Sequence, residues 1–370
     1  MYTWNKVRVF ISAGDFSGDV FASRLAKTFI GSGWDVSSVG GAALREAGAD
    51  IIEDVSGRNA IGFIEPVRNI FFFRRLLGRI KEFCKRDRPD AAVMVDFWGF
   101  NSQLLPLFSA AGTPVFYYIC PQIWASRFGR IKKIKKYVSK VFPVFPFAEK
   151  IYLENGVSAL FPGHPLAQML PPPAYNPESP YIGLLPGSRK SELDRHLPVM
   201  VKVVNLLGSE GNFRFKCFKA PSLPKALYAS LPNNCELLED KDYSHRQNLR
   251  LAISSSGTAS FENAMLGIPT LIMYKTSFVS YFIAKQIVKT RFIGMPNILA
   301  GKSVTPELIQ SAAAPFRILR EVRGMLKKDN LLGISAELLQ LRPLLDKKNA
   351  EENIVGEIEK LLAVRGGGIS

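Results

Sequence analysis

The sequence predicts an α/β protein with two domains, each built on a parallel sheet flanked by helices. Short apolar runs alternate with helix-like stretches, which is typical of βαβ units. The length of 370 residues exceeds what one hydrophobic core usually serves, and a proline-rich segment separates two such series. Hydrophobic residues make up 47% and charged residues 22%, which places the chain among folded globular proteins rather than disordered ones.

The first half of the chain begins with a predicted buried strand at 7–12, a loop at 14–19 and a helix at 20–29. Further apolar runs at 91–95 and 114–119 predict two more strands. Because helical stretches separate these strands, we expect them to lie parallel in one sheet.

A linker is predicted at 169–180, because five prolines make this stretch stiff and poor in backbone donors. It divides an N-terminal domain, 1–168, from a C-terminal domain, 181–345. Residues 346–370 predict a separate C-terminal helix, in which apolar residues recur at helical spacing. The strands of the second domain are expected at 181–185, 213–218, 251–254 and 269–274.

The net charge of +16 favours an anionic partner. Acidic lipid headgroups and phosphorylated small molecules fit this charge, whereas the usual nucleic-acid motifs do not occur, so no nucleic acid is expected. The N-terminus does not resemble a signal peptide, and no run approaches the ~18 apolar residues of a transmembrane helix. Four scattered cysteines, without CxxC, HxH or HExxH spacing, predict buried thiols of a cytosolic protein and no metal site.

Three glycine-containing loops follow predicted strands, at 12–19, 186–189 and 255–262. In open α/β sheets, ligands bind at the carboxyl ends of strands, where helix N-termini offer amide donors to phosphates. Two loops belong to the second half, and one contains Arg189, whose charge suits a diphosphate. The pair favours a nucleotide-binding second domain, although one such loop alone is more often an ordinary turn.

Several polar residues have both a functional and a structural interpretation. Asp96 follows the strand at 91–95 among aromatic residues, which suits a general base of raised pKa or a loop cap. The structural interpretation applies equally to Asn101. Glu262 lies in the first turns of a predicted helix and would accept hydrogen bonds from a ribose or complement the helix dipole.

The three histidines are isolated in the sequence. His164 lies where the first half ends and would line an interdomain cleft, but a structural role is the favoured interpretation. His196 and His245 lie in polar stretches, so we expect them at the surface.

Residues 62–83, GFIEPVRNIFFFRRLLGRIKEF, combine aromatic and aliphatic residues with arginines. This composition suits a helix lying in a membrane interface. An ordinary helix packed on the sheet is the alternative, but three consecutive phenylalanines exceed what one buried stripe needs. A second basic run at 130–136 forms a solvated face or adds lipid attraction. The predicted membrane patch consists of Phe63, Ile64, Val67, Phe71, Phe72, Phe73 and Leu76.

Nine segments, taken in order, resemble the lipid-A-disaccharide synthase family, which consists of inverting glycosyltransferases of the GT-B fold. The segments are SAGDFSGD, GFIEPV, VDFWGFN, YYICPQIWASR, FPFAEKIY, GHPL, LLPGSR, SSGTASFE and KTRFIGMPNILAG. The resemblance implies two Rossmann-like domains facing a central cleft, with the C-terminal helix crossing back to the first domain.

The resemblance also implies a reaction. The family transfers 2,3-diacylglucosamine from its UDP carrier to the 6-hydroxyl of 2,3-diacylglucosamine 1-phosphate, and releases a β-1,6 disaccharide 1-phosphate and UDP. It implies no cofactor and no catalytic metal. The expected partners are UDP-diacylglucosamine, diacylglucosamine 1-phosphate and an acidic membrane surface, and a homodimer stays an open expectation. The expected location is cytoplasmic, peripheral on the inner face of the inner membrane.

Carried over by position, Asp96 matches the candidate general base and Arg189 the arginine beside the leaving diphosphate. The other residues on the nucleotide-sugar side are Gly187, Ser188, Ser256, Gly257, Thr258, Glu262 and Asn297. Those of the first domain are Gly14, Asp15, Ser17, Gly18, Asp19, Glu65, Asn101 and His164.

Four positions depart from the family pattern. Asp15 and Ala148 stand where glutamates are usual, with Glu149 beside the second. Gly99 replaces a second aspartate, and Ser126 replaces a tryptophan. These departures keep two alternatives open, namely another UDP-sugar enzyme of the GT-B fold and a catalytically silent paralogue that binds nucleotide or lipid.

Overall fold

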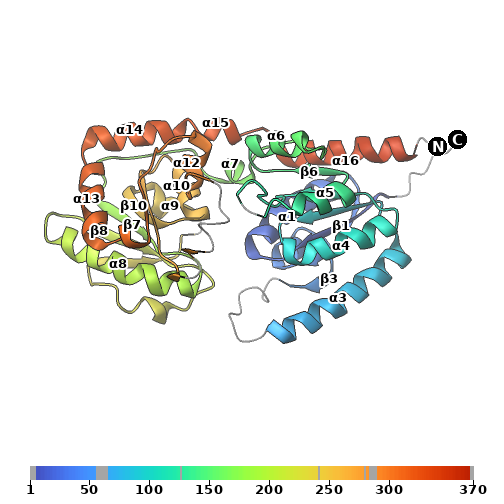
Figure 1. Ribbon diagram of the computed structural model, residues 1–370, viewed down its shortest axis with the longest axis horizontal. Coiled ribbons are helices and arrows are strands. Elements are labelled where there is room, and N and C mark those ends of the chain that lie inside the picture. The colour runs from blue at the N-terminus through green and yellow to red at the C-terminus, as the bar shows by residue number, and fades with distance from the viewer. Residues whose placement is uncertain are drawn as a thin grey trace. The chain divides into compact units, whose positions relative to one another are not determined.

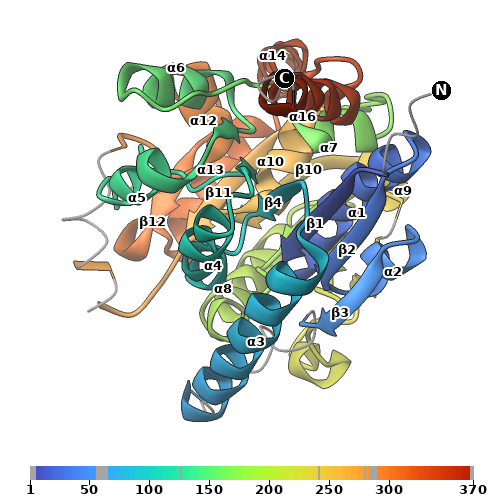
Figure 2. The same cartoon turned by 90° about the vertical axis from the view of Figure 1, so that its right-hand side faces the viewer.

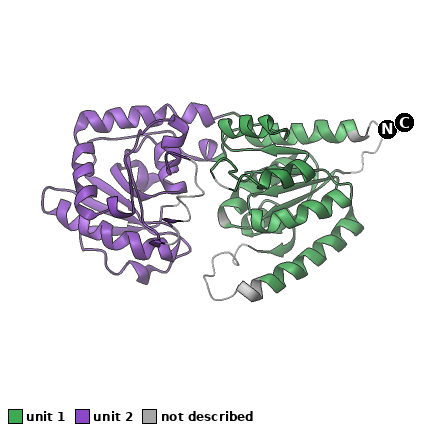
Figure 3. Ribbon diagram, in the orientation of Figure 1, with its two compact units in different colours: residues 1–165, 347–370 green, residues 166–346 purple. Residues whose placement is uncertain are grey.

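The computed structural model describes residues 6–55, 66–125, 127–240, 242–278, 281–282 and 290–366. The chain divides into two compact units (Figure 3). Unit 1 contains residues 1–165 and 347–370, and unit 2 contains residues 166–346. Each unit is a six-stranded sheet with helices packed against it (Figure 1).

The sheet of unit 1 has the order β3-β2-β1-β4-β5-β6, and all of its pairings are parallel. Its strands are β1 (Arg8–Ala13), β2 (Asp35–Gly40), β3 (Asp50–Asp54), β4 (Ala91–Val95), β5 (Val115–Tyr118) and β6 (Lys140–Phe142). Its helices are α1 (Phe16–Gly31), α2 (Ala42–Glu46), α3 (Pro66–Asp87), α4 (Trp98–Ala110), α5 (Arg130–Tyr137), α6 (Pro146–Glu154) and α16 (Ala350–Gly366).

Helices cover both faces of this sheet. Apolar side chains of α3, α4 and α5 form one core with Phe10 of β1. Helix α1 instead packs with α2 and α16 (Figure 2). Strand β4, with the sequence AAVMV, is buried throughout, as expected for a parallel strand covered on both sides. The C-terminal helix belongs to unit 1 and is fastened there by the ion pairs Arg24–Glu351, at 2.5 Å, and Lys140–Glu357, at 2.6 Å.

The sheet of unit 2 has the order β12-β11-β10-β7-β8-β9, again parallel throughout. Its strands are β7 (Tyr181–Leu185), β8 (Arg214–Phe218), β9 (Cys235–Leu238), β10 (Leu249–Ser255), β11 (Thr270–Tyr274) and β12 (Glu307–Ile309). The main helices are α8 (Lys190–Gly208), α10 (Thr258–Met265), α13 (Pro315–Met325) and α14 (Lys328–Leu339). Shorter ones are α7 (Pro165–Met169), α9 (Ser244–Gln247), α12 (Met295–Ala300), α15 (Arg342–Leu345), and the 3₁₀ turns η1 (Lys225–Tyr228) and η2 (Gln310–Ala312).

Both sheets reverse their strand order at one point. In unit 1 the reversal lies between β1 and β4, and in unit 2 between β7 and β10. Loops that leave the carboxyl ends of such neighbouring strands diverge and leave a crevice in which ligands bind. The predicted loops at 12–19, 186–189 and 255–262 all stand at these reversal points.

The structure also bears on the expectations about membrane-spanning helices, cysteines and metal sites. None of the described helices combines the length and apolar character that crossing a membrane requires. All four cysteines are free and buried. Among the described residues, no cluster of histidine, cysteine and carboxylate side chains could hold a metal ion.

Candidate active site

Asp96 stands at the end of β4, on the reversal point of the unit 1 sheet. Both Asp96 and Phe97 have a left-handed backbone, with φ of +46°, which costs about 1–3 kcal/mol for each non-glycine residue. The surrounding chain holds this conformation in place. The carbonyl oxygen of Asp96 accepts hydrogen bonds from the Tyr117 hydroxyl, at 2.5 Å, and from Nδ2 of Asn101, at 3.0 Å. Its N–H donates to the carbonyl of Tyr118, at 3.1 Å.

The environment of Asp96 favours a basic carboxylate. Desolvation and, second, the neighbouring charge of Asp15 raise its pKa to about 6, against the opposing effects of the Phe97 amide and Arg130. Asp96 is nevertheless an exposed residue, so solvent screening limits the shift. A carboxylate of this kind is mostly ionised at neutral pH and is a better proton acceptor than an ordinary aspartate.

The loop after β1 lies beside Asp96, and its close contacts leave no room for a side chain at two glycine positions. Asp15 caps α1, because its Oδ1 accepts a hydrogen bond from the amide of Gly18 at 2.6 Å. A Cβ atom on Gly18 would lie 2.7 Å from this oxygen. A Cβ atom on Gly14 would overlap the ring of Phe97. Glycine at position 14 therefore lets the loops after β1 and β4 meet, and glycine at position 18 leaves room for the Asp15 cap.

Three predicted residues of unit 1 are buried in the protein rather than open to a ligand. Asp19 accepts hydrogen bonds from the amides of Gly41, at 2.6 Å, and Ala43, at 2.9 Å, and so caps α2. Asn101 accepts a hydrogen bond from the Ser12 hydroxyl at 2.6 Å and donates one to the Asp96 carbonyl.

His164 is the third of these buried residues. Its ring packs on Phe145 at 5.3 Å, and burial lowers its pKa to about 3, so it is neutral. This agrees with the structural interpretation of His164. Ser17 is exposed on the first turn of α1, and Glu65 lies outside the described residues.

In unit 2, the loop after β7 presents an exposed guanidinium. Gly187 has φ of +119°, and a Cβ atom there would press on Glu192. The amide of Ser188 donates to Glu192 Oε2 at 3.2 Å, which fixes the loop at the start of α8. The Arg189 side chain is 76% exposed, and its contact with Glu192, at 3.3 Å, is a weak surface pair. It remains available to an anion.

The loop after β10 stands beside the loop after β7, because these two strands are paired. Gly257 and Thr258 are exposed where α10 begins, and the Ser256 hydroxyl donates to the Ile293 carbonyl at 3.0 Å. Glu262 is partly buried and engaged. It pairs with Arg246 at 2.5 Å and accepts a hydrogen bond from the Tyr243 hydroxyl at 3.1 Å.

The expectation that His196 lies at the surface is wrong. The side chain is completely buried and joins two loops of unit 2. Its Nε2 accepts a hydrogen bond from the amide of Lys275 at 2.9 Å, so its Nδ1 carries the proton and donates to the Pro186 carbonyl at 2.7 Å. His196 therefore anchors the loop that carries Arg189.

The prediction that Asn297 contacts the nucleotide meets a similar correction. The residue is completely buried. Its Oδ1 accepts from the amides of Val304 and Thr305, at 2.8 and 2.9 Å, and its Nδ2 donates to the Thr305 carbonyl and to Glu307, both at 2.8 Å. The whole amide group is used to fasten one loop, so no part of it faces a ligand.

Comparison with known proteins decides the family. Residues 9–333 match the family model described as lipid-A-disaccharide synthetase. The chain belongs to the lipid-A-disaccharide synthase family. It is 33% identical to a protein of that name from Coxiella burnetii, strain CbuG_Q212, over 96% of this chain and 98% of the relative. It is also 33% identical to the one from Syntrophus aciditrophicus, over 94% and 96%. The predicted family and enzyme class, a glycosyltransferase of lipid A biosynthesis, are confirmed.

Solved structures support the GT-B fold. A putative UDP-N-acetylglucosamine 2-epimerase from Listeria monocytogenes superposes with a TM-score of 0.67 and 12% identity, covering 97% of both chains. MurG from Acinetobacter baumannii superposes with a TM-score of 0.59 and 16% identity, covering 96% of this chain and 100% of MurG. The calicheamicin glycosyltransferase CalG4 superposes with a TM-score of 0.63 and 13% identity, covering 97% of this chain and 99% of CalG4. These likenesses concern the fold alone, and they confirm the predicted fold class.

The structure locates three of the four departures from the lipid-A-disaccharide synthase pattern. Gly99 is exposed, and open space surrounds the position that a side chain would occupy. Ala148 is buried, while the adjacent Glu149 accepts a hydrogen bond from the Phe161 amide at 2.9 Å. Asp15 is the helix cap beside Asp96 described above. Ser126 lies outside the described residues.

The described residues of the predicted membrane patch differ in exposure. Phe71 is 66% exposed, whereas Phe72 and Phe73 are half-buried against the core, and Phe73 packs on Phe100 at 5.0 Å. Leu76 is buried in the core and is no part of an exposed face, because it lies on the side of α3 turned to the sheet. Phe63 and Ile64, and the side chain of Val67, lie outside the described residues.

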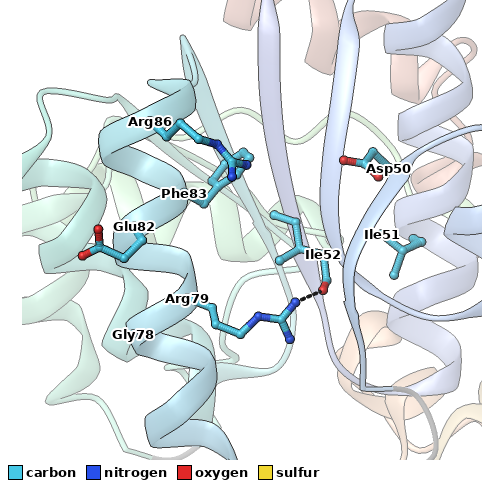
Figure 4. A pocket seen from close by; sticks show the side chains of 8 residues that line it. All are labelled: Asp50, Ile51, Ile52, Gly78, Arg79, Glu82, Phe83 and Arg86. Atoms are coloured by element: carbon cyan, nitrogen blue, oxygen red, sulfur yellow. Dashed lines mark hydrogen bonds between the residues drawn. The ribbon is translucent and has the colours of Figure 1, made fainter.

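A pocket of about 680 Å³ lies elsewhere in unit 1, between α3 and the edge strand β3 (Figure 4). Arg79 reaches from α3 and donates to the Ile52 carbonyl at 2.7 Å. The pocket also contains Asp50, at the start of β3, and so does not lie with Asp96 at the carboxyl ends of the strands. We do not assign it to the active site.

The sequence did not single out three residues around Asp96. Tyr117 reads as one of several apolar residues of a strand, and Trp98 as a core aromatic. Arg130 reads as one member of a basic run. Arg130 stands out only because it begins the helix that follows β5, the strand next to β4.

Proposed function

We propose that the protein transfers 2,3-diacylglucosamine from UDP to the 6-hydroxyl of 2,3-diacylglucosamine 1-phosphate, with inversion at the anomeric carbon. The family supports the kind of reaction. The observation that carries the proposal is Asp96, an exposed carboxylate of raised pKa on a strained backbone at the reversal point of a parallel sheet.

In this proposal, Asp96 is the general base. Its carboxylate takes the proton of the acceptor 6-hydroxyl as that oxygen attacks the anomeric carbon of the donor. The bond between this carbon and the diphosphate oxygen breaks, and its electron pair leaves with UDP. Attack from the side opposite to UDP turns an α-linked donor into a β-linked product. The chemistry that we assign to this chain needs no cofactor.

The loops of unit 2 are assigned to UDP. Charge develops on the diphosphate as it leaves, so groups that bind it more strongly at that stage accelerate the reaction. The exposed guanidinium of Arg189 and the amides at the starts of α8 and α10 are suited to this role. Glu262 already forms an ion pair with Arg246 and accepts a hydrogen bond from Tyr243. Its remaining lone pairs would accept hydrogen bonds from the ribose hydroxyls.

Both substrates carry acyl chains, so we propose that the enzyme works at an acidic membrane surface, on the inner face of the inner membrane. The net charge of +16 favours such a surface. In unit 1, Ile70 and Phe71 expose 52% and 66% of their surface beside the arginines at 74 and 75, which is the composition of an interfacial contact.

The test is the Asp96→Asn variant, assayed with both substrates in detergent. Loss of a general base is expected to lower turnover by about 10²–10⁴-fold. UDP affinity, measured by titration calorimetry, should stay within error of the parent, because Asp96 lies in unit 1. Asp35→Asn, which removes an exposed carboxylate paired with Lys6, is the matched control. Near-normal turnover by Asp96→Asn would overturn the assignment.

A further inference from the structure

Two arginines lie after β5, at the same edge of the unit 1 sheet as Asp96. Arg130 is the first residue of α5, and Arg127 precedes it in the loop with a left-handed backbone, at φ of +57°. Strand β5 pairs with β4, and α5 packs beside α4 (Figure 2). The two guanidinium groups thus belong to the loop adjacent to the one that carries the candidate base.

A stack of side chains links Arg130 to Asp96. The Arg130 guanidinium lies over the Trp98 ring, 5.3 Å from its centroid. The Trp98 ring packs on Tyr117, with centroids 5.9 Å apart, and the Tyr117 hydroxyl donates to the Asp96 carbonyl. Arg130 is therefore held by an aromatic face at a defined place relative to the base rather than moving freely in solvent.

Neither guanidinium group forms an ion pair with another described residue, although the charge of Asp96 acts on Arg130 from a longer distance. Within the described part of the chain, no carboxylate lies within 4.0 Å of either guanidinium. Burial, followed by repulsion from Arg127, lowers the pKa of Arg130. The N-terminal end of α5 adds further positive potential instead of offsetting it. Arg127 is exposed, whereas Arg130 is partly buried, and a partly desolvated cation is stabilised when an anion binds to it.

We propose that Arg127 and Arg130 bind the 1-phosphate of the acceptor and thereby place its 6-hydroxyl at Asp96. This inference rests on the proposed function. A phosphate monoester is nearly a dianion at neutral pH, and planar guanidinium groups bind it through paired hydrogen bonds. In the acceptor, C1 and C5 flank the same ring oxygen, so a phosphate held at the arginines presents the 6-hydroxyl one sugar ring away. The arginines therefore select a phosphorylated acceptor.

The experiment compares two acceptors, 2,3-diacylglucosamine with and without its 1-phosphate. For the parent enzyme, loss of the phosphate should raise the acceptor KM by about 10- to 100-fold, as expected for charge-assisted hydrogen bonds. Arg127→Gln with Arg130→Gln should raise the KM of the phosphorylated acceptor by a similar factor and leave the donor KM unchanged. This double variant should no longer distinguish the two acceptors. Arg130→Lys, which keeps the charge but loses the paired geometry, should recover part of the difference.

Lys132→Gln is the matched control, because it removes one positive charge from an exposed position on the same helix. It should preserve the preference for the phosphorylated acceptor. Two results would overturn the inference. One is an equal loss by the arginine variants on both acceptors, which would mean a structural role. The other is reduced binding to anionic phosphatidylglycerol vesicles with an unchanged acceptor preference, which would assign the arginines to lipid headgroups.

Equilibrium binding of each acceptor without donor separates this inference from the proposed function. If the parent binds the phosphorylated acceptor more tightly, and the double variant does not, the phosphate site stands even if no disaccharide forms. If the parent forms the disaccharide but binds both acceptors equally, the proposed function stands and the phosphate site fails.

Discussion

The hydroxyl of Tyr117 donates a 2.5 Å hydrogen bond to the carbonyl oxygen of Asp96. This bond joins β5, which carries Tyr117, to the backbone after β4, which is left-handed at both Asp96 and Phe97. Tyr117 does not reach the substrate in our account. It holds the peptide from which the candidate base projects, and it supports the Trp98 ring beneath Arg130.

Tyr117→Phe should therefore lower turnover about tenfold, because a small displacement of a catalytic group costs this much or more. The loss of stability should be about 0.5–1.5 kcal/mol, since Asn101 still donates to the same carbonyl. Tyr118→Phe is the control, because the Tyr118 hydroxyl is buried and has no hydrogen-bond partner among the described residues. Turnover and urea unfolding of both variants check the prediction, and equal turnover would contradict it.

The pH dependence of kcat/KM should report the pair Asp15 and Asp96. A base with a pKa near 6 predicts that kcat/KM falls as the pH drops below about 6, because the protonated carboxyl no longer accepts a proton. Asp15 raises this pKa, so Asp15→Asn should move the acidic limb to lower pH. Asparagine also caps helices, and α1 should persist. Superimposable pH profiles would show that the Asp15 charge does not act on the base.

His196 should matter for both stability and UDP binding. His196→Ala leaves the Pro186 carbonyl and the Lys275 amide unpaired in a buried place, and should cost about 2–4 kcal/mol at pH 8. UDP affinity should fall as well, since the loop carrying Arg189 loses its anchor. His245→Ala, at a partly exposed position, should change neither quantity. Unchanged UDP affinity in a folded His196→Ala protein would contradict the anchoring role.

His196 should also make the stability of the folded protein depend on pH. Burial lowers the pKa of His196 below its ordinary value. The unfolded chain therefore binds a proton that the folded protein refuses, and the parent loses stability as the pH falls below about 6.5. His196→Ala cannot show this loss, so the stability difference between the two proteins should narrow at pH 5.5. Urea unfolding at pH 8 and pH 5.5 measures it.

Membrane contact should depend on the exposed tip of α3 alone. Ile70→Ser with Phe71→Ser should reduce co-flotation with anionic vesicles and leave thermal unfolding nearly unchanged, because both side chains are exposed. Phe73→Ser should instead destabilise the fold, since this ring packs on Phe97 and Phe100. Phe278→Ser, at an 81% exposed position of unit 2, is the comparison. If Phe278→Ser alone reduced flotation, the contact would belong to unit 2.

The fold was readable from sequence where strands are buried on both faces. Strand β4 is a continuous apolar run, and its end marks Asp96 directly. Strand β2, with the sequence DVSSVG, was not predicted, because buried Ser38 interrupts the apolar signal. The edge strand β3 is short and flanked by aspartates, and it was not predicted either.

The site was harder to read, because sequence neighbours do not report burial. His196 was expected at the surface from its polar neighbours, yet it lies three residues after Leu193 and four before Met200, on the apolar face of α8. That helical spacing was the signal that could have located it. No comparable signal exists for Asn297 or Asp19, because backbone amides of other loops bind their side chains. The arginines after β5 acquire meaning only because β5 lies next to β4.

The most direct test of the central claim is the product formed by the purified parent protein. UDP-2,3-diacylglucosamine and 2,3-diacylglucosamine 1-phosphate would be incubated with it in detergent, and the products identified by mass spectrometry. We expect a disaccharide 1-phosphate with a β-1,6 linkage, and one UDP for each disaccharide. UDP binding without any disaccharide would contradict it, and would leave the chain as a nucleotide-binding protein whose acceptor is different or whose catalytic step is lost.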